Sequence, residues 1–229
     1  MEKTSLIIDQ IRIAPKEEAA FNAFLHHEYL PALLKNPEIS CIRRYEEFGT
    51  KGSLAWFNKS FLTIYELSSA QNLDDLTKEI PEKLQMEMRK YQTEKFRFFS
   101  RNRYREIYVH ERKAINGPFG SRPFFVVTVE AEGQKQKEFQ TWYDEKYLPK
   151  TMADIPMWCA CRRYASVGRQ PAHYHTIYEA ENIWDLERGF ELLRAAYRFG
   201  SNTEWESWVG PAITFQNAAS FQPIFRRPG

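Results

Sequence analysis

His173 and His175 are the residues of this chain whose type and spacing most directly suggest chemistry. They stand two positions apart in a run rich in strand-forming residues, so both side chains should lie on one face of a strand, with Tyr174 on the other. Histidine titrates near neutral pH and serves as acid, base or metal ligand. We therefore predict that one or both act in acid–base catalysis. The alternative is that His173 is exposed after Pro171 and that His175 is a hydrogen-bonded core group.

Two further kinds of polar residue could contribute to a site. His110 alternates with Tyr108 and Glu106 near the end of a predicted strand, so these side chains form a polar and aromatic face that could line a cavity. Tyr29 and Tyr147 each precede a Leu-Pro pair and could donate a hydrogen bond to a substrate carbonyl. A tyrosine that packs its ring and leaves its hydroxyl in water is the commoner case.

Two arginine pairs, in Arg43-Arg44-Tyr45 and Arg162-Arg163-Tyr164, place one guanidinium on each face of a strand. An arginine on a buried face needs a carboxylate or a ligand, because burial of the charge alone is too costly. Arg43 and Arg162 are therefore candidate substrate-binding residues. The structural alternative is an ion pair within the protein, for which Glu66 and Glu179 on the next strand are the expected partners.

These residues belong to a sequence that repeats itself. The segment 139–149 is similar in sequence to the segment 21–31, which lies 118 positions earlier. The Arg-Arg-Tyr and Ile-Tyr-Glu motifs also recur in the same order. Such an internal repeat constrains the architecture more firmly than local propensity does. We predict a first repeat at 1–115, a linker rich in Gly and Pro at 116–123 and a second repeat at 124–229.

Each repeat has the same predicted order of elements. A β-branched or aromatic run opens it, an amphipathic helix follows, two short strands come next, and a second helix and a last strand close it. The predicted segments are 6–13, 21–29, 40–48, 61–67, 73–98 and 104–111 in the first repeat, and 124–129, 139–147, 159–167, 174–180, 183–199 and 214–225 in the second. The β-α-β-β-α-β order is that of a ferredoxin-like α+β unit.

The first helix of each repeat carries an aromatic face. Phe139, Trp142, Tyr143 and Tyr147 repeat the spacing of 21, 24, 25 and 29. We predict that Trp142 and Tyr143 contact a substrate, since the abundance of aromatic residues suggests a pocket walled by rings. The prolines that follow should end or kink the helix near each tyrosine.

Composition excludes several classes of function. The chain has 32 basic and 30 acidic residues, and no long block of one sign indicates a nucleic-acid or membrane surface. No apolar run is long enough to span a bilayer and the first residues do not form a signal-peptide core, so we expect a cytoplasmic protein. The three cysteines suit a reducing compartment. Motifs for nucleotide or zinc binding are absent from the sequence, so we expect no metal.

The motif F-x-x-W-Y-x-E-x-x-L-P followed by R-R-Y resembles EthD-like members of the dimeric α+β barrel superfamily. The resemblance covers both repeats and implies that their antiparallel sheets pack into one pseudo-twofold barrel. A duplicated chain would then form the pseudo-dimer internally as a monomer, although exposed sheet edges leave a homodimer open. EthD-like motifs commonly carry histidine before Leu-Pro, where this chain has Tyr29 and Tyr147, so the role of that histidine does not transfer.

The resemblance suggests a cofactor-independent enzyme that acts by acid–base chemistry on a small, largely apolar oxygenated or carbonyl compound, as a lyase, cyclase, isomerase or oxygenase does. Haem is an alternative, because duplicated barrels of this superfamily include haem enzymes and a histidine can ligate iron. A non-catalytic protein that binds a hydrophobic metabolite is another. In the preferred interpretation His173 or His175 is the base, and Tyr147 or an arginine stabilises the oxyanion.

Overall fold

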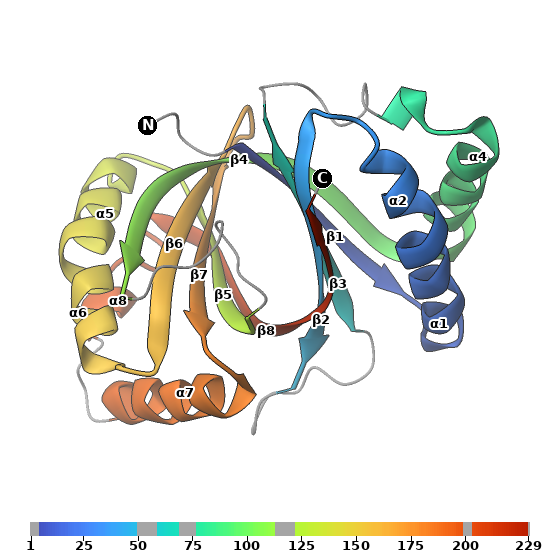
Figure 1. Ribbon diagram of the computed structural model, residues 1–229. Coiled ribbons are helices and arrows are strands. Elements are labelled where there is room, and N and C mark those ends of the chain that lie inside the picture. Colours follow the sequence, from blue (N-terminus) through green and yellow to red (C-terminus); the bar gives the residue numbers. More distant parts are fainter. Residues whose placement is uncertain (1–4, 50–58, 69–76, 113–121, 199–202, 229) are drawn as a thin grey trace. The chain divides into compact units, whose positions relative to one another are not determined.

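A computed structural model describes residues 5–49, 59–68, 77–112, 122–198 and 203–228 (Figure 1). The chain forms two compact units. Unit 1 comprises Met1–Tyr104 with Pro223–Gly229, and unit 2 comprises Arg105–Gln222. The predicted join at 116–123 lies largely outside the described residues. The predicted repeat boundaries stay a prediction. The two units are defined by contacts in space, whereas the repeats are defined by similarity of sequence.

Unit 1 begins with strand β1 (Ser5–Ile13), which pairs with β3 (Ser60–Leu67). Strand β2 (Ile39–Phe48) pairs with the other edge of β3, and both pairings are antiparallel. The helical segments that follow β1 run together as α1 (Pro15–Phe24), η1 (Leu25–Tyr29) and α2 (Leu30–Leu33). Alternate apolar side chains of the strands and the aromatic face of α1 and η1 form the hydrophobic core of this unit.

The second helical region of unit 1 is shorter than predicted. It consists of η2 (Thr77–Glu79), α4 (Glu82–Lys90) and η3 (Tyr91–Lys95), and the first residues of the predicted helix lie outside the described part. Phe96 begins strand β4 (Phe96–Glu111), so the prediction of helix up to residue 98 was wrong there. The aromatic residues of this stretch suit a strand, and the Phe96 ring packs against Phe21 at 5.1 Å.

Unit 2 has strands β5 (Phe124–Ala131), β6 (Trp158–Ser166) and β7 (Ala172–Ala180). Strand β7 pairs antiparallel with β5 and β6, and β5 also pairs with β8 (Ile213–Pro228). The helical segments are α5 (Gln136–Trp142), η4 (Tyr143–Tyr147), α6 (Leu148–Asp154), α7 (Ile183–Arg198) and α8 (Thr203–Glu206). The order of elements in the described residues follows the predicted one closely.

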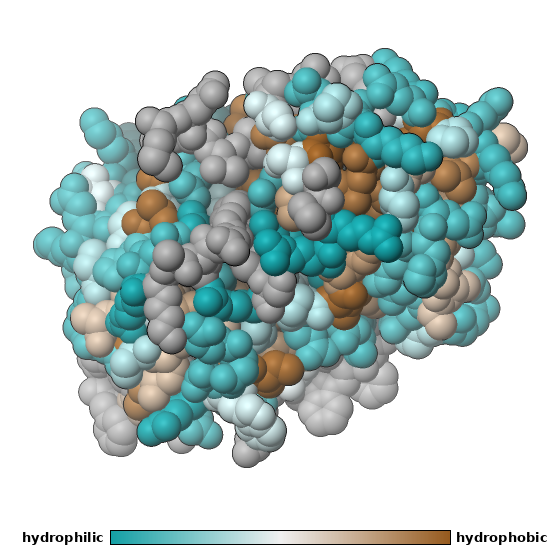
Figure 2. Space-filling model, viewed as in Figure 1, coloured by the Kyte–Doolittle hydropathy of each residue, from teal (hydrophilic) through white to brown (hydrophobic). Residues whose placement is uncertain are grey.

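The described strands hydrogen bond in the order β1-β3-β2-β8-β5-β7-β6-β4, which closes as a barrel, so the fold is an α+β barrel. Within the described residues, no helix is long and apolar enough to cross a membrane. The face drawn in Figure 2 is largely hydrophilic, with hydrophobic patches scattered over it.

The prolines do not end the first helix of either unit, so of the two predicted outcomes, an end or a kink, the end is wrong. In unit 1 a π-helical turn at Leu25–Tyr29 precedes Pro31, and the helix continues to Leu33. In unit 2 the same turn at Tyr143–Tyr147 precedes Pro149. In the wider turn the N–H group before each proline bonds to the carbonyl five residues back: Leu30 to Leu25 in unit 1, and Leu148 to Tyr143 in unit 2. Tyr29 and Tyr147 therefore lie within continuous helical segments.

Candidate functional site: an aromatic cavity in unit 2

A cavity of about 800 Å³ lies within unit 2, lined by residues of β5, β6, β7, β8, the helical segments and the stretch after α8. Six of its lining side chains are aromatic: Phe125, Tyr143, Tyr147, Trp158, Tyr178 and Trp205. A concave, mostly apolar space with a few polar groups is typical of a small-molecule site. The cavity is therefore the candidate functional site.

Two buried tyrosine hydroxyls supply the central polar feature of the cavity. The hydroxyl oxygens of Tyr143 and Tyr178 are 3.5 Å apart. Burial raises the pKa of Tyr143 to about 12, against an opposing effect of Arg163, and burial raises the pKa of Tyr178 well above its ordinary value. Both groups therefore stay protonated at neutral pH. Two hydroxyls at this separation can donate hydrogen bonds to one oxygen of a ligand.

Neighbouring rings hold the two tyrosines in place. Tyr147 stacks on Tyr143 with ring centroids 5.0 Å apart and an interplanar angle of 17°. The Trp158 ring lies 4.4 Å from that of Tyr178. Trp205 of α8 lies 5.8 Å from Tyr143. This packing fixes the position of the hydroxyl pair, as a preorganised binding site requires.

The absence of a side chain at Gly189 of α7 leaves room for the Trp158 ring. A Cβ atom at Gly189 would come within 2.5 Å of Trp158 Nε1, and Trp158 is fully buried. We expect Gly189→Ala to destabilise the protein by about 1–3 kcal/mol through overpacking, despite a gain in helix propensity of about 1 kcal/mol. Urea unfolding measures the change. The same substitution in a Trp158→Phe background should cost less, and equal costs in both backgrounds would show that the contact is not the cause.

The corresponding position of unit 1 is occupied by an ion pair. Asp9 faces Thr63 across β1 and β3, as Val127 faces Thr176 across β5 and β7. Arg101 donates two hydrogen bonds to Asp9, of 2.7 and 2.8 Å. Tyr65, the counterpart of Tyr178 in the repeat, donates its hydroxyl to Asp9 at 3.2 Å. Tyr65 of unit 1 thus hydrogen bonds to a carboxylate, whereas its counterpart in unit 2, Tyr178, faces a cavity.

One arginine of each pair holds the first helix of its unit. Arg163 is fully buried, donates to Asp144 at 2.5 Å and to Gln140, and lies 4.5 Å from the Tyr143 ring centroid. These contacts fix the turn that carries Tyr143 and Tyr147. The carboxylate of Asp144 balances the charge of Arg163.

The equivalent Arg44 of unit 1 has neutral partners. It donates to Asn22 Oδ1 at 2.9 Å and lies 2.7 Å from His26 Nε2. Burial, then Arg44 and His27, lower the pKa of His26 to about 4, so the neutral ring accepts the hydrogen bond. The same helix position therefore carries an anion in unit 2 and a histidine in unit 1.

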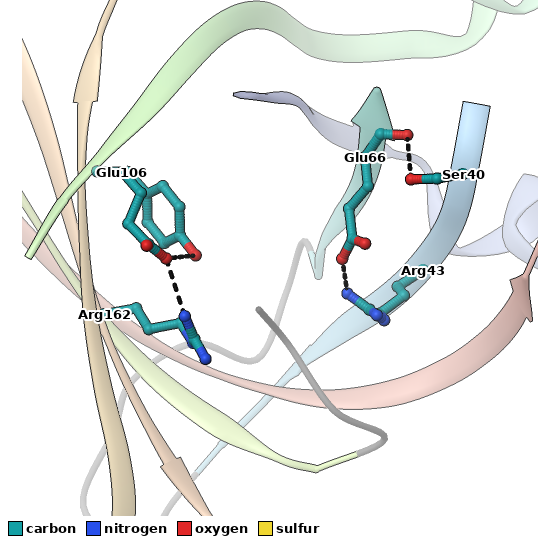
Figure 3. A network of polar contacts seen from close by, with 6 residues as sticks. Ser40, Arg43, Glu66, Glu106 and Arg162 are labelled. Carbon is teal, nitrogen blue, oxygen red and sulfur yellow. Dashed lines mark hydrogen bonds and ion pairs between the residues drawn. The ribbon is translucent and has the colours of Figure 1, made fainter. Parts of the chain in front are cut away.

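The other arginine of each pair forms an ion pair (Figure 3). Arg43 of β2 binds Glu66 of β3, as predicted. Arg162 of β6 binds Glu106 at 2.9 Å and also Glu111, both on β4. Glu179, the predicted partner, lies on β7, whereas these two carboxylates come from β4, which lies beside β6 in the strand order. Both guanidinium charges are balanced within their own units, which favours the structural alternative for Arg43 and Arg162.

The two histidines of β7 face away from the cavity. Their ring centroids are 4.9 Å apart, and His175 Nδ1 lies 2.8 Å from Thr128 Oγ1. The alternate residue Tyr174 points to the helices, where Gln136 donates to its hydroxyl at 3.1 Å. Tyr178 lies on that same face of β7. A catalytic role for His173 or His175 stays a prediction, but it does not involve this cavity.

The remaining predicted site residues lie apart from the cavity lining or just behind it. Trp142 is buried with its ring 5.2 Å from Tyr147. Tyr29 is buried in unit 1, where its ring lies 5.8 Å from Phe24. His110 is half-buried near the end of β4. Of the predicted residues, Tyr143 and Tyr147 line the cavity.

Comparisons with known proteins show the fold. No protein-family model matches the chain, and no curated protein sequence matches it. An anthrone oxidase-like protein matches with a TM-score of 0.68 at 11% identity, over 99% of this chain and 94% of its own. A candidate monooxygenase from Fusobacterium nucleatum subsp. nucleatum matches with a TM-score of 0.62 at 8% identity, over 99% and 95%. A chlorite dismutase from Candidatus Nitrospira defluvii has a TM-score of 0.50 at 12% identity, over 97% and 93%. At these low identities the likeness shows that the chain shares the fold of these proteins.

Proposed function

We propose that this protein is a cofactor-independent enzyme that binds a small, largely apolar aromatic ketone in the cavity of unit 2 and removes a proton from it. The pair of tyrosine hydroxyls inside an aromatic cavity is the observation that carries the proposal. Both hydroxyls are donors at neutral pH, and the oxygen of an enolate accepts hydrogen bonds more strongly than that of the ketone. Tyr143 and Tyr178 therefore stabilise the deprotonated substrate more than the substrate itself, which is what catalysis requires.

Glu206 is the proton acceptor in this proposal. Among the described residues that line the cavity, it is the one carboxylate. The proton passes from a C–H group conjugated with the carbonyl, such as the CH₂ opposite the carbonyl of anthrone, to the Glu206 carboxylate, and the electron pair of the broken C–H bond stays on the substrate as the enolate. Glu206 is exposed on α8, so it can return the proton to water. The name of one structural relative, an anthrone oxidase-like protein, agrees with a substrate of this chemical class.

Hydrogen–deuterium exchange tests the proposal without knowledge of the final product. Anthrone incubated with the protein in D₂O should exchange its acidic C–H faster than buffer allows, as followed by NMR. Glu206→Gln should lower the enzymatic rate by about 10²-fold or more, the usual scale of a general base. Glu204→Gln, an equal change of charge on the same exposed helix, is the control.

Two results of this experiment contradict the proposal. Equal rates for wild type and Glu206→Gln would remove Glu206 as the base. Tight binding of the ketone with no exchange would favour the alternative of a non-catalytic binding protein.

Haem fits this cavity poorly. Among its described lining residues there is no histidine, cysteine or methionine, and the two histidines of β7 face the other way. The lining tyrosines are the groups that could ligate iron, but Tyr143 and Tyr178 are strongly disfavoured as anions. The haem alternative stays a prediction, and haemin added to the purified protein without a Soret band would exclude it.

We further propose that 1–115 and 124–229 arose by tandem duplication of an EthD-like unit. The π-helical turns recur at equivalent positions, Leu25–Tyr29 and Tyr143–Tyr147. Arg44 and Arg163 each contact the residues that precede and begin that turn. These shared details support common descent of the two halves, and the differences at the cavity support the function of the second.

A further inference from the structure

Arg163 is a buried cation that lies against two tyrosine rings of unit 2. Its side chain is fully buried, and its guanidinium carbon is 4.5 Å from the ring centroid of Tyr143 and 4.9 Å from that of Tyr174. A guanidinium group at such a distance from a ring makes a favourable cation–π contact. Tyr143 lines the cavity and Arg163 does not. The cavity therefore has a positive charge behind the tyrosine that forms part of its wall.

The register of the strands brings further groups to the same phenol. Arg163 of β6 stands opposite Thr176 of β7, so both side chains lie on the face of the sheet that carries Tyr178. The Thr176 side chain hydrogen bonds with Tyr143, and the Tyr178 hydroxyl lies 3.5 Å from that of Tyr143. Tyr143 thus has a cation at its ring and hydroxyl groups at its oxygen.

The charge of Arg163 acts on Tyr143 in one direction. Burial raises the pKa of Tyr143 to about 12, and among the groups that oppose burial Arg163 has the largest effect. A nearby cation favours the anionic form of a phenol, which makes the neutral phenol a stronger hydrogen-bond donor. Hydrogen bonds of this kind gain most when the acceptor becomes an anion, as the substrate oxygen does in an enolate.

Unit 1 shows that an arginine at this position does not need a carboxylate partner. Arg44 is fully buried, and its contacts with Asn22 and His26 are with neutral groups. The residue of unit 1 that aligns with Tyr143 is Leu25, so Arg44 has no phenol at this position. In unit 2 the arginine has both a carboxylate partner and a phenol.

We propose that Arg163 is a positioning residue of the proposed reaction, whose charge strengthens the hydrogen bond that Tyr143 donates to the substrate oxygen as the enolate forms. The proposal rests on the proposed function, in which Tyr143 and Tyr178 bind that oxygen. Asp144 binds Arg163 at 2.5 Å and balances its charge. Loss of the Asp144 carboxylate should therefore have the opposite effect on catalysis to loss of the Arg163 cation.

Two variants test this opposition of signs. Asp144→Asn keeps a hydrogen-bond acceptor for Arg163, as Asn22 does for Arg44, and should exchange anthrone at least as fast as wild type. Arg163→Gln combined with Asp144→Asn removes both charges and leaves no buried charge unpaired. This double variant should exchange anthrone about tenfold more slowly, the effect of about one pKa unit in the donor. Affinity for xanthone, a flat ketone without an acidic C–H bond, should not change.

The pKa of bound para-nitrophenol is a readout that a packing role would not move in this order. The oxygen of its anion stands in for the enolate oxygen, and the anion absorbs visible light, so an absorbance titration measures the pKa in the complex. Compared with wild type, we expect a lower value in Asp144→Asn and a higher one in the double variant. In a Tyr143→Phe background the difference between them should largely disappear, because Arg163 acts through Tyr143.

Arg44→Gln is the matched control, since it removes the equivalent arginine of unit 1. It should lower stability in urea but leave the exchange rate and the pKa of bound para-nitrophenol unchanged. If Asp144→Asn and the double variant both lose rate, the role of Arg163 is structural and this inference is wrong, while the proposed function stands. Should the double variant fail to fold, slower exchange in Asp144→Asn alone would overturn the inference. If wild-type protein exchanges no anthrone, the proposed function itself fails.

Discussion

Tyr143→Phe and Tyr178→Phe should each lower the rate of ketone deprotonation by about 10²-fold, with little effect on affinity for the ketone itself. Loss of one donor to a developing oxyanion has effects of this size. The ketone is bound mainly by the aromatic walls, which remain. Exchange rates in D₂O and titration of xanthone measure the two quantities separately. The double variant should lose little more than the worse single one, since the two hydroxyls act on one oxygen.

Tyr174→Phe is the control for these variants. Tyr174 lies on β7 on the same face as Tyr178, but its hydroxyl accepts a hydrogen bond from Gln136. It does not line the cavity. Its rate should stay within about twofold of wild type. An equal loss of rate in Tyr174→Phe and Tyr178→Phe would indicate general damage to unit 2, and would remove the hydroxyl pair as the source of catalysis.

The free energy of unfolding should fall steeply between pH 6.5 and pH 4. Burial, then Arg44 and His27, lower the pKa of His26 to about 4. Burial and then Arg169 lower the pKa of His173 to about 4 as well, although Glu130 acts in the opposite direction. The unfolded chain takes up these protons near pH 6.5 while the folded protein does not. Stability is therefore lost as the pH falls through this window, by about 1–2 kcal/mol for each residue, because solvent screens the charges around these partly exposed rings.

Glutamine variants test the assignment of this loss. His26→Gln keeps a hydrogen-bond acceptor for Arg44 without a titrating group, so the loss of stability between pH 7.5 and pH 4.5 should shrink. His173→Gln should have an effect of similar size in unit 2. His27→Gln, at the exposed neighbouring position, is the control. Urea unfolding at several pH values measures each variant, and identical pH profiles for wild type and His26→Gln would contradict the assignment.

The fold was largely predictable from the sequence, because it depends on patterns within short segments. The strands around His175 and Arg43 alternate as the sequence indicates, and the aromatic spacing of 139–147 locates the helical face. The π-helical turns were missed because the proline suggested an end to the helix. A change of hydrogen-bond register leaves no mark in the pattern of apolar residues.

The cavity was harder to predict, because it is the space that packing leaves unfilled. Tyr143 and Tyr147 were identified from the aromatic face, whereas Tyr178, Trp205 and Gln216 were not. A usable signal was present in the differences between the repeats: Leu25 corresponds to Tyr143, and Asp9 corresponds to Val127. We expected the largest difference, the histidine pair of β7, to mark the site, and the structure places that pair on the other face of the strand.

The division of β8 between the two units bears on the order in which the protein can fold during synthesis. Unit 2 is one continuous stretch of chain, but unit 1 includes Pro223–Gly229 in addition to Met1–Tyr104. The Phe225 ring stacks on His26 at 4.8 Å, so this late segment takes part in the packing of unit 1. The ribosome makes these residues after the whole of unit 2. The half of the protein that is synthesised first is therefore the half that is completed last.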